Sequence, residues 1–235
     1  MSAGSCLLSI RTLFLLLLVL PGTALAERIA IIGTGDVGSA LGIEFAALGH
    51  DIVYGSRDPS RNEVKTLVER TGGTASATTQ AKSVVDADLV VLAVPGRLAV
   101  SIVEGLGDLS GKVIIDPTNH YIRDGVPRLA TATSNGESIQ AAAPDAHVVK
   151  AFNTLNWRQM VDPDSSGGPV SIPLAGDSAE AKARVAELVA GMGLEPVDVG
   201  PIQNARHVEG MLVLWIQARV NGEPFDYHLR KTGSQ

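Results

Sequence analysis

The sequence predicts an α/β protein built on a Rossmann-type, doubly wound and mainly parallel sheet, followed by a short C-terminal helical piece. Three observations support this fold class. Short apolar runs typical of strands alternate with helical patterns along the chain. A glycine-rich turn, Gly33-x-Gly35-x-x-Gly38, directly follows the first apolar run. The run at 88–94, DLVVLAV, is almost wholly apolar, which is typical of a strand buried on both faces of a parallel sheet.

The first strand–helix–strand unit is predicted within residues 28–57. Residues 29–32 form the expected first strand, and a helical pattern follows until Gly49. A second apolar run at 52–54 then begins the next strand. This order is the first half of a dinucleotide-binding fold. The alternative interpretation is a turn that merely connects a strand to a helix.

Each glycine of the turn has an expected role in holding a dinucleotide. Gly33 lets the chain turn sharply, Gly35 lets the backbone approach a pyrophosphate, and Gly38 lets the helix lie close to the sheet. The helix N-terminus would offer free N–H groups and a partial positive charge to the phosphates. We therefore predict that this turn binds a pyrophosphate.

The end of the second strand favours NADP over NAD. An NAD site usually has an acidic residue there to bind the ribose 2′-hydroxyl, whereas this chain has Gly55-Ser56-Arg57. A hydroxyl and a guanidinium suit a 2′-phosphate, which a carboxylate would repel. Asp58 is acidic, but Pro59 suggests that the chain already turns away. The alternative for Arg57 alone is a solvated loop cation.

The rest of the chain continues the alternation of strands and helices. Helices are expected at 59–70, 79–86, 98–106, near 138–142, at 177–190 with Asp177 as the cap, and at 203–220. Strands are expected at 74–76, 88–94, 112–115, 147–151, 170–175 and 195–199, with 224–229 as a candidate edge strand.

Residues at the carboxyl ends of the predicted strands are candidates for the nicotinamide end of the site. In doubly wound sheets, ligands bind beyond those ends, where the strand order reverses. The candidates are Val94-Pro95, Thr118-Asn119 and Phe152-Asn153. Each also has a structural alternative, since Pro95 could simply end a strand and Asn119 could cap a turn.

Composition excludes several classes of function. The 235-residue chain has a net charge of −6 and few aromatic residues, which does not suit nucleic-acid binding. We found no pattern of a catalytic triad or a metalloprotease, and the five histidines lack metal-ligand spacing. We therefore expect neither a side-chain acid–base catalyst nor a metal site, and we take His207 as a minor candidate for the pocket.

The N-terminal segment is predicted to be separate from the fold. Arg11 precedes an apolar stretch, and Pro21-Gly22 and Ala24-Leu25-Ala26 follow it, as in a secretory signal peptide. We expect a signal peptide at 1–26, with an uncleaved anchor as the alternative, and a single domain at 27–235. The protein would be periplasmic or secreted with this signal, and cytoplasmic if the start is misassigned. No membrane span is expected after residue 26.

The chain has little room for a separate substrate domain, because one long predicted helix follows Gly200. The second substrate must then meet the Rossmann face, that helix or a partner subunit. This favours a flat redox acceptor whose ring stacks on nicotinamide, because direct hydride transfer needs alignment and exclusion of water rather than an acid or base.

Seven segments together resemble a known family: GTGDVG, YGSRDP, LAVP, DPTN, VVKAFNT, PLAGD and VDVGPIQNARHVEGM. They resemble the NADP oxidoreductases that use coenzyme factor 420, a 5-deazaflavin. The chain is also similar to the oxidoreductase domain of STEAP-type ferric reductases, which pair NADPH with a flavin. The resemblance covers the chain from Arg28 to Arg230, and Phe152-Asn153-Thr154 is closer to the ferric-reductase branch.

The resemblance implies specific roles for residues of the predicted site. It implies that NADP is held at the turn by Thr34, Asp36 and Val37, and at the 2′-phosphate by Ser56 and Arg57. It also implies that Val94, Pro95 and the segment Ala151-Phe152-Asn153 lie near the nicotinamide.

The sequence therefore predicts an NADP(H)-dependent oxidoreductase with a flavin, a deazaflavin or another small redox molecule as acceptor. A non-catalytic NADP-binding sensor is the first alternative, and an imine reductase of the pyrroline-carboxylate type is the second. A homodimer is left open, as are the acceptor and the direction of hydride transfer.

Overall fold

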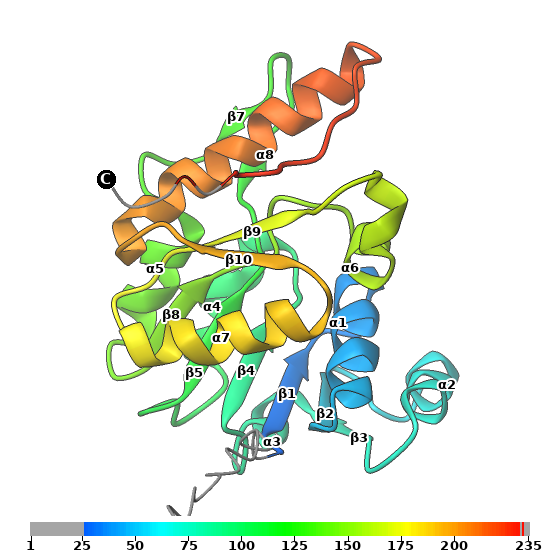
Figure 1. Cartoon of the computed structure of the whole chain (residues 1–235). Helices are drawn as coiled ribbons and strands as arrows, with labels where there is room; N and C mark the ends of the chain where they lie inside the picture. The colour runs from blue at the N-terminus through cyan, green and yellow to red at the C-terminus, as the bar shows by residue number, and fades with distance from the viewer. Residues whose placement is uncertain (1–25, 231, 233–235) are drawn as a thin grey trace, which may run out of the picture.

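A six-stranded parallel sheet forms the centre of the computed structural model, which describes residues 26–230 and residue 232 (Figure 1). The order reverses between β1 and β4, which is the arrangement that binds dinucleotides in doubly wound folds. The predicted fold class is thus confirmed. The strand order is β3-β2-β1-β4-β5-β8, with β1 Arg28–Ile32, β2 Asp51–Ser56, β3 Ser76–Thr79, β4 Leu89–Leu92, β5 Val113–Asp116 and β8 His147–Lys150.

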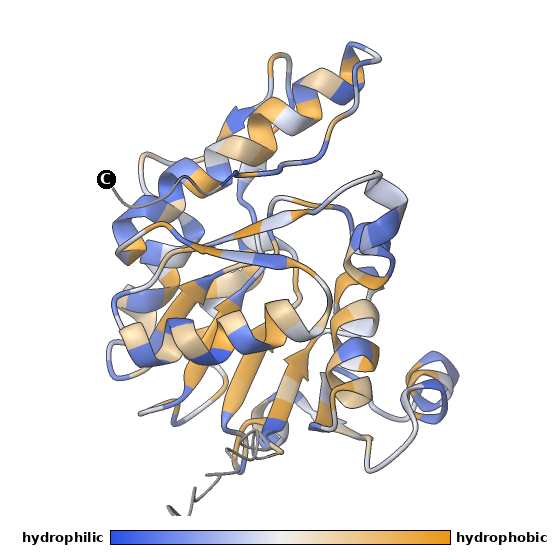
Figure 2. Ribbon diagram, viewed as in Figure 1, coloured by the Kyte–Doolittle hydropathy of each residue, from blue (hydrophilic) through white to orange (hydrophobic). Residues whose placement is uncertain are grey.

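Helices cover both faces of this sheet because alternate strand residues point to opposite sides. Ile29 and Ile31 of β1 pack in one core layer with residues of α1 and α7, whereas Ala30 and Ile32 pack in another with residues of α4 and α5. Figure 2 shows the central strands as the most hydrophobic part of the ribbon. The helices are α1 Asp36–Ala47, α2 Asn62–Thr71, α3 Gln80–Ser83, α4 Ala99–Glu104, α5 Asn135–Ala142, α6 Trp157–Val161, α7 Ala179–Gly191 and α8 Ala205–Val220.

The last two predicted strands do not extend the six-stranded sheet. β9, Ser171–Leu174, and β10, Glu195–Asp198, form a separate two-stranded parallel sheet joined by α7 (Figure 1). One antiparallel bridge between Lys150 and Ala175 connects β9 to the end of β8. The sequence located both strands, but pattern alone could not assign their partners.

Several short elements were not predicted. The stretch after Asn119 contains a hairpin of β6, Tyr121–Ile122, and β7, Arg128–Leu129. The helix α6 and the 3-10 turns η1, Gly96–Leu98, η2, Pro163–Ser166, and η3, Ile202–Asn204, were also missed. Such pieces of two to five residues are too short to show a periodic pattern.

Two smaller predictions were wrong. The cap of α7 is Ser178, whose side chain accepts a hydrogen bond from the Ala181 N–H, while the Asp177 carboxylate accepts one from the Ile202 N–H. The tail at 224–229 forms no strand, although the Tyr227 carbonyl accepts a hydrogen bond from the Ser171 N–H.

The predicted signal peptide lies almost wholly outside the described residues, which begin at Ala26. In the part of the chain that the structure describes, no helix combines the length and apolarity needed to cross a membrane.

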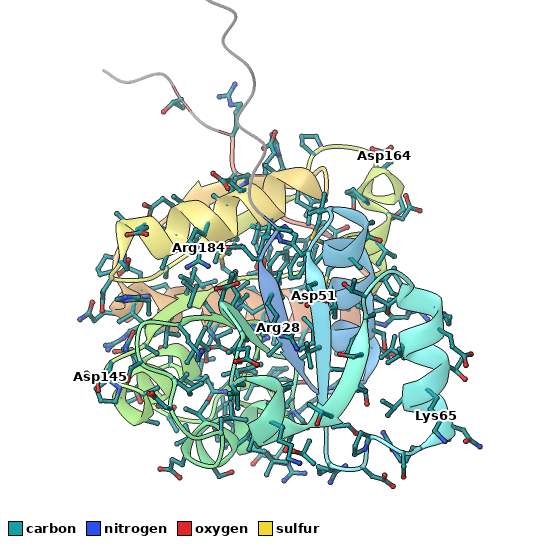
Figure 3. All side chains as sticks on the ribbon, turned by 90° about the horizontal axis from the view of Figure 1, so that it is seen from below. Arg28, Asp51, Lys65, Asp145, Asp164 and Arg184 are labelled. Atoms are coloured by element: carbon teal, nitrogen blue, oxygen red, sulfur yellow. The ribbon has the colours of Figure 1, made fainter. Side chains whose placement is uncertain are left out.

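Ion pairs lie at the amino ends of the strands, opposite the glycine turn. Arg28 at the start of β1 and Asp51 at the start of β2 lie together in Figure 3, with 3.0 Å between Arg28 Nη1 and Asp51 Oδ2. Arg184 of α7 pairs with Glu27 at the same edge. The charged groups at this edge are therefore paired within the fold.

Candidate functional site

Two of the three turn glycines are required by the packing of the chain itself. Gly33 has φ +112°, and a Cβ there would lie 2.1 Å from the Ala93 carbonyl oxygen. Its N–H donates to the Gly55 carbonyl at 3.0 Å, which ties the turn to the end of β2. A Cβ on Gly38 would lie 2.1 Å from the Gly33 carbonyl oxygen, so Gly38 brings α1 against the turn.

Gly35, in contrast, faces open space. Among the described residues, a Cβ at this position would meet no atom within 4 Å, and the φ of −84° suits any residue. Gly35 is the N-cap of the 12-residue helix α1, and no side chain caps this helix. Its first N–H groups therefore point outward at a positively polarised helix end. Thr34 and Val37 are half-buried, and Asp36 is exposed beside them.

Ser56 and Arg57 lie at the end of β2, beside this turn in the sheet. The Ser56 side chain is buried, and its hydroxyl donates to the Asp58 carbonyl at 3.0 Å and accepts from the Asp58 N–H at 3.2 Å. The hydroxyl thus shapes the loop after β2. The Arg57 side chain is exposed and makes no ion pair with the described residues.

A second cation at this site, Arg61, was not predicted from the sequence. It is the N-cap residue of α2, and its Nη2 lies 3.4 Å from the Thr34 hydroxyl of the glycine turn. The side chain therefore spans from the loop after β2 to the turn after β1. The sequence does show a second arginine four residues after Arg57. Because the helix was expected to begin at Pro59, Arg61 was taken as a helical residue and not as a residue at the helix start.

The next two strand ends approach each other closely. Val94 and Pro95 follow β4, and a Cβ on the adjacent Gly96 would lie 2.0 Å from the Asn119 carbonyl oxygen. Asn135 of α5 donates from Nδ2 to the Gly96 carbonyl at 2.9 Å. The loop after β4 and the loop after β5 therefore form one packed surface.

Asn119 and Asn153 hydrogen-bond to each other across the ends of β5 and β8. Asn119 Nδ2 donates to the Asn153 carbonyl at 3.1 Å, and Asn153 Nδ2 donates to Asn119 Oδ1 at 3.0 Å. Asn153 Nδ2 also lies 3.2 Å from the Val208 carbonyl of α8. This pair fixes both strand-end loops beneath α8.

Ala151 and Phe152 are buried, so their side chains belong to the core. Phe152 packs edge-on against Phe45 of α1, with 6.2 Å between ring centroids. Among the described residues it is the non-glycine residue with positive φ, at +62°. Such a conformation is strained for a bulky residue and often occurs at functional sites. In this conformation the phenyl ring points into the core, and only the backbone of Phe152 remains at the end of β8.

A buried ionic cluster lies directly beneath this surface and was not predicted. Lys150 Nζ lies 2.6 Å from Asp116 Oδ2 and 2.7 Å from Glu209 Oε1, and it donates to the Thr118 carbonyl at 2.7 Å. Asp116 and Lys150 have no exposed surface, and Glu209 is 1% exposed. Burial raises the pKa of Glu209, and its attraction to Lys150 offsets only part of this effect.

The described histidines do not gather into a metal-binding cluster. In the described residues no three or more His, Cys, Asp or Glu side chains gather as a metal site would require. His207 is exposed on α8 and lines an apolar cavity of about 300 Å³ with Val208, Met211 and Leu229, among others. His50 Nδ1 accepts a hydrogen bond from the Glu27 N–H.

Comparison with known proteins points to the same family as the sequence motifs. The family described as "NADP oxidoreductase coenzyme F420-dependent" matches residues 28–120. The crystal structure of a putative F420-dependent NADP reductase from Arthrobacter sp. FB24 superposes with a TM-score of 0.80 and 32% identity. The match covers 88% of this chain and 100% of that chain.

Two curated relatives match about four fifths of this chain, one of them over only part of its own length. Metalloreductase STEAP3 of Rattus norvegicus is 31% identical over 79% of this chain and 36% of its own length. The F420-dependent NADP reductase of Methanothermobacter marburgensis is 26% identical over 82% of this chain and 92% of its own length. This chain thus spans about a third of the metalloreductase.

The glycine turn, the reversed strand order and the structural match over 88% of this chain agree. The chain belongs to the family of NADP oxidoreductases described as coenzyme F420-dependent.

Proposed function

We propose that this protein binds NADP(H) and transfers a hydride between nicotinamide and a flavin, a deazaflavin or another small redox acceptor. One observation carries the proposal. The uncapped N-terminus of α1 opens outward at Gly35, where a side chain would meet no described protein atom within 4 Å. The Arg61 side chain reaches the Thr34 hydroxyl of the same turn, and Arg57 follows the neighbouring strand β2. Such an arrangement suits a pyrophosphate beside a 2′-phosphate.

The phosphates would lie at the glycine turn. The backbone of Gly33, Thr34, Gly35, Asp36, Val37 and Gly38 would hold the pyrophosphate. The Arg57 guanidinium and the buried Ser56 loop would hold the 2′-phosphate. Arg61, which lies 3.4 Å from the Thr34 hydroxyl, would close the same site from α2.

The nicotinamide would lie at the carboxyl ends of β4, β5 and β8. Its expected neighbours are Val94, Pro95, Asn119 and the segment Ala151-Phe152-Asn153. The bound cofactor would give or take the hydride at its nicotinamide ring. The chain's own contribution is to orient the ring and exclude water, since the mutual hydrogen bonds of Asn119 and Asn153 keep this surface rigid. No side-chain acid or base is assigned to the transfer.

The phosphate assignment is tested by replacing the two arginines. Arg57→Ala and Arg61→Ala should each reduce the affinity for NADPH by about tenfold or more and leave the affinity for NADH nearly unchanged, because NADH lacks the 2′-phosphate. Lys65→Ala is the matched control, because Lys65 is an exposed cation on the same helix α2 (Figure 3). Titration calorimetry with both cofactors measures the ratio. An unchanged NADPH to NADH ratio in both arginine variants would contradict the assignment.

A non-catalytic NADP sensor is the second candidate, which the lack of an assigned acid or base allows. Turnover of NADPH with deazaflavin, flavin, ferric and cyclic imine acceptors separates the candidates. Turnover with a deazaflavin or flavin supports the proposal, whereas binding of NADPH without turnover supports the sensor. Reduction of the imine alone would support the imine-reductase alternative.

Three further sequence predictions are carried forward as proposals. We propose a single domain at 27–235 after a signal peptide at 1–26, with export as the consequence. The intact mass of the natively purified protein tests cleavage after Ala26. A homodimer remains a prediction, which light scattering of the purified protein measures directly.

A further inference from the structure

The buried cluster of Asp116, Lys150 and Glu209 contains an excess of acidic groups. Two carboxylates share one ammonium group, so the fully ionised cluster has one net negative charge. Lys150 uses its donors on Asp116, Glu209 and the Thr118 carbonyl. A buried unbalanced charge has a large desolvation cost and is uncommon unless something compensates it.

Both carboxylate oxygens of Asp116 have polar neighbours within the cluster. Its Oδ1 accepts from the Thr118 N–H at 2.8 Å and from the Thr118 hydroxyl at 2.6 Å, and its Oδ2 lies 2.6 Å from Lys150 Nζ. Asp116 and Lys150 are also register partners at the ends of β5 and β8. This pair therefore forms the neutral part of the cluster.

Glu209 is the carboxylate that carries the excess charge. It shares Lys150 with Asp116, and its Oε1 accepts the Gly136 N–H at 3.3 Å near the N-terminus of α5. The charged groups that face it are Asp116 from β5 and Lys150 from β8. The Glu137–Arg206 pair lies farther out, at the half-exposed edge of the contact between α5 and α8.

The cluster is bonded directly to the expected nicotinamide surface. Lys150 holds the carbonyl of Thr118, which precedes Asn119. Glu209 follows Val208, whose carbonyl accepts from Asn153 Nδ2. The cluster is therefore linked to the Asn119–Asn153 pair through Thr118 after β5 and through Val208 of α8. A charge in this buried layer acts through protein rather than through water, where the interaction would be screened.

We propose that the Asp116–Lys150–Glu209 cluster sets the redox preference of the bound nicotinamide, with the negative charge of Glu209 favouring the oxidised, positively charged ring. The inference rests on the proposed function, because it requires nicotinamide at the strand ends. Hydride loss leaves a cationic ring, and a fixed anion beneath it stabilises that state over the neutral reduced ring. Glu209 would then act on the ring through its charge, without touching it.

The test compares affinities for NADP⁺ and NADPH in the wild-type protein and in Glu209→Gln. The substitution removes the excess charge and keeps the shape. At pH 9 it should raise the ratio of the dissociation constants, NADP⁺ over NADPH, by about tenfold, which raises the two-electron reduction potential of the bound cofactor by about 30 mV. Titration of the 2′-phosphate affects both cofactor forms and largely cancels in the ratio.

Glu137→Gln is the matched control, because it removes a carboxylate from the same α5–α8 contact without altering the buried charge. Its ratio should equal that of the wild-type protein. In the wild-type protein the ratio should rise as the pH falls through the folded-state pKa of Glu209, which burial raises above its ordinary value, while Glu209→Gln should show no such change.

The outcomes separate this inference from the proposed function. If the wild-type protein binds neither form of the cofactor, the proposed function fails and the inference fails with it. If both forms bind and Glu209→Gln keeps the wild-type ratio at pH 9, only the inference is overturned. If Glu209→Gln does not fold, the wild-type pH profile decides, and a ratio that stays constant from pH 9 down to pH 4, below the ordinary pKa of a glutamate, overturns the inference.

Discussion

At the scale of single residues, the structure separates glycines that the fold needs from one that the fold does not explain. Gly33 and Gly38 lie where any Cβ would overlap a carbonyl oxygen at 2.1 Å. Gly35 has no such neighbour and an unstrained backbone. The sequence predicted all three from their spacing, and the structure assigns the first and third to packing. Gly35 is therefore the glycine whose role depends on the proposed pyrophosphate at the helix N-terminus.

This difference predicts opposite results for two matched substitutions. Gly38→Ala should lower the free energy of unfolding by about 1–3 kcal/mol, because α1 must move from the turn. Gly35→Ala should change it by less than about 1 kcal/mol and weaken NADPH binding about tenfold, since the methyl group would occupy the phosphate position. Urea denaturation and calorimetric titration measure the two quantities. Wild-type affinity in folded Gly35→Ala would refute the pyrophosphate assignment.

Other residue roles could not be predicted from the sequence. Ser56 stays a predicted neighbour of the 2′-phosphate, but the bonds of its hydroxyl to the Asp58 backbone, which shape the loop after β2, could not be predicted. Arg61 was missed because its place depends on where α2 begins, and helix starts are the least certain part of a pattern. The inward turn of Phe152 rests on a positive φ, which is rare for a bulky residue and leaves no mark in the sequence.

At the scale of elements, α5 positions the side chain that joins two strand-end loops. The helix begins with a capping box, in which Ser134 accepts from the Glu137 N–H and Glu137 accepts from the Ser134 N–H. The next residue, Asn135, donates to the Gly96 carbonyl and to the Thr118 hydroxyl. A correct start of α5 is therefore needed to hold the loops after β4 and β5 together.

Ser134→Ala tests this role of the cap. Ser134 is fully buried, so losing its two hydrogen bonds should lower the free energy of unfolding by about 1–2 kcal/mol. Ser101→Ala is the control, because the Ser101 hydroxyl bonds a carbonyl near the start of α4 but is exposed, and it should cost less than about 0.5 kcal/mol. Denaturant unfolding compares the two variants. An equal effect of both substitutions would argue against the cap.

Element positions were largely predictable, whereas element partners were not. The apolar run that contains β4 and the glycine turn before α1 define their own structure locally. The parallel pair of β9 and β10 has similar local patterns, yet its single bridge to β8 is a long-range outcome. The two-residue strands of the β6–β7 hairpin are too short for any period to be read.

At the scale of the whole molecule, α8 connects the C-terminal part of the chain to the strand ends through charge as well as packing. Glu209 reaches the buried cluster, and Arg206 pairs with Glu137 at the rim. The pKa values of the two glutamates, Glu209 and Glu137, are shifted in opposite directions. Burial raises the pKa of Glu209. Burial also opposes ionisation of Glu137, but the bonds from Arg206 and Ser134 outweigh it and lower its pKa.

These directions predict how stability changes with pH. Because the pKa of Glu209 is higher in the folded state than its ordinary value of 4.5, the folded state binds more protons above that value and loses stability as the pH rises. Glu209→Gln removes this loss, so the stability of the variant relative to the wild-type protein should increase with pH until Glu209 is ionised. Thermal unfolding between pH 4 and 9 measures the difference. A difference that stays constant or decreases would contradict the assignment.

Glu137 gives the opposite dependence. Its lowered pKa contributes stability above its ordinary value, which is lost as the pH falls through the folded-state pKa. Glu137→Gln should therefore be less stable than the wild-type protein near neutral pH and approach it under acidic conditions. The same unfolding series tests this expectation, and an equal deficit at every pH would be inconsistent with it.

The central claim is that the glycine turn and the two arginines beside it hold a dinucleotide bearing a 2′-phosphate. The most direct measurement is calorimetric titration of the purified protein with NADPH and with NADH under the same salt conditions. We expect NADPH to bind at least tenfold more tightly than NADH. Equal affinities, tighter binding of NADH or no binding of either cofactor would contradict the claim.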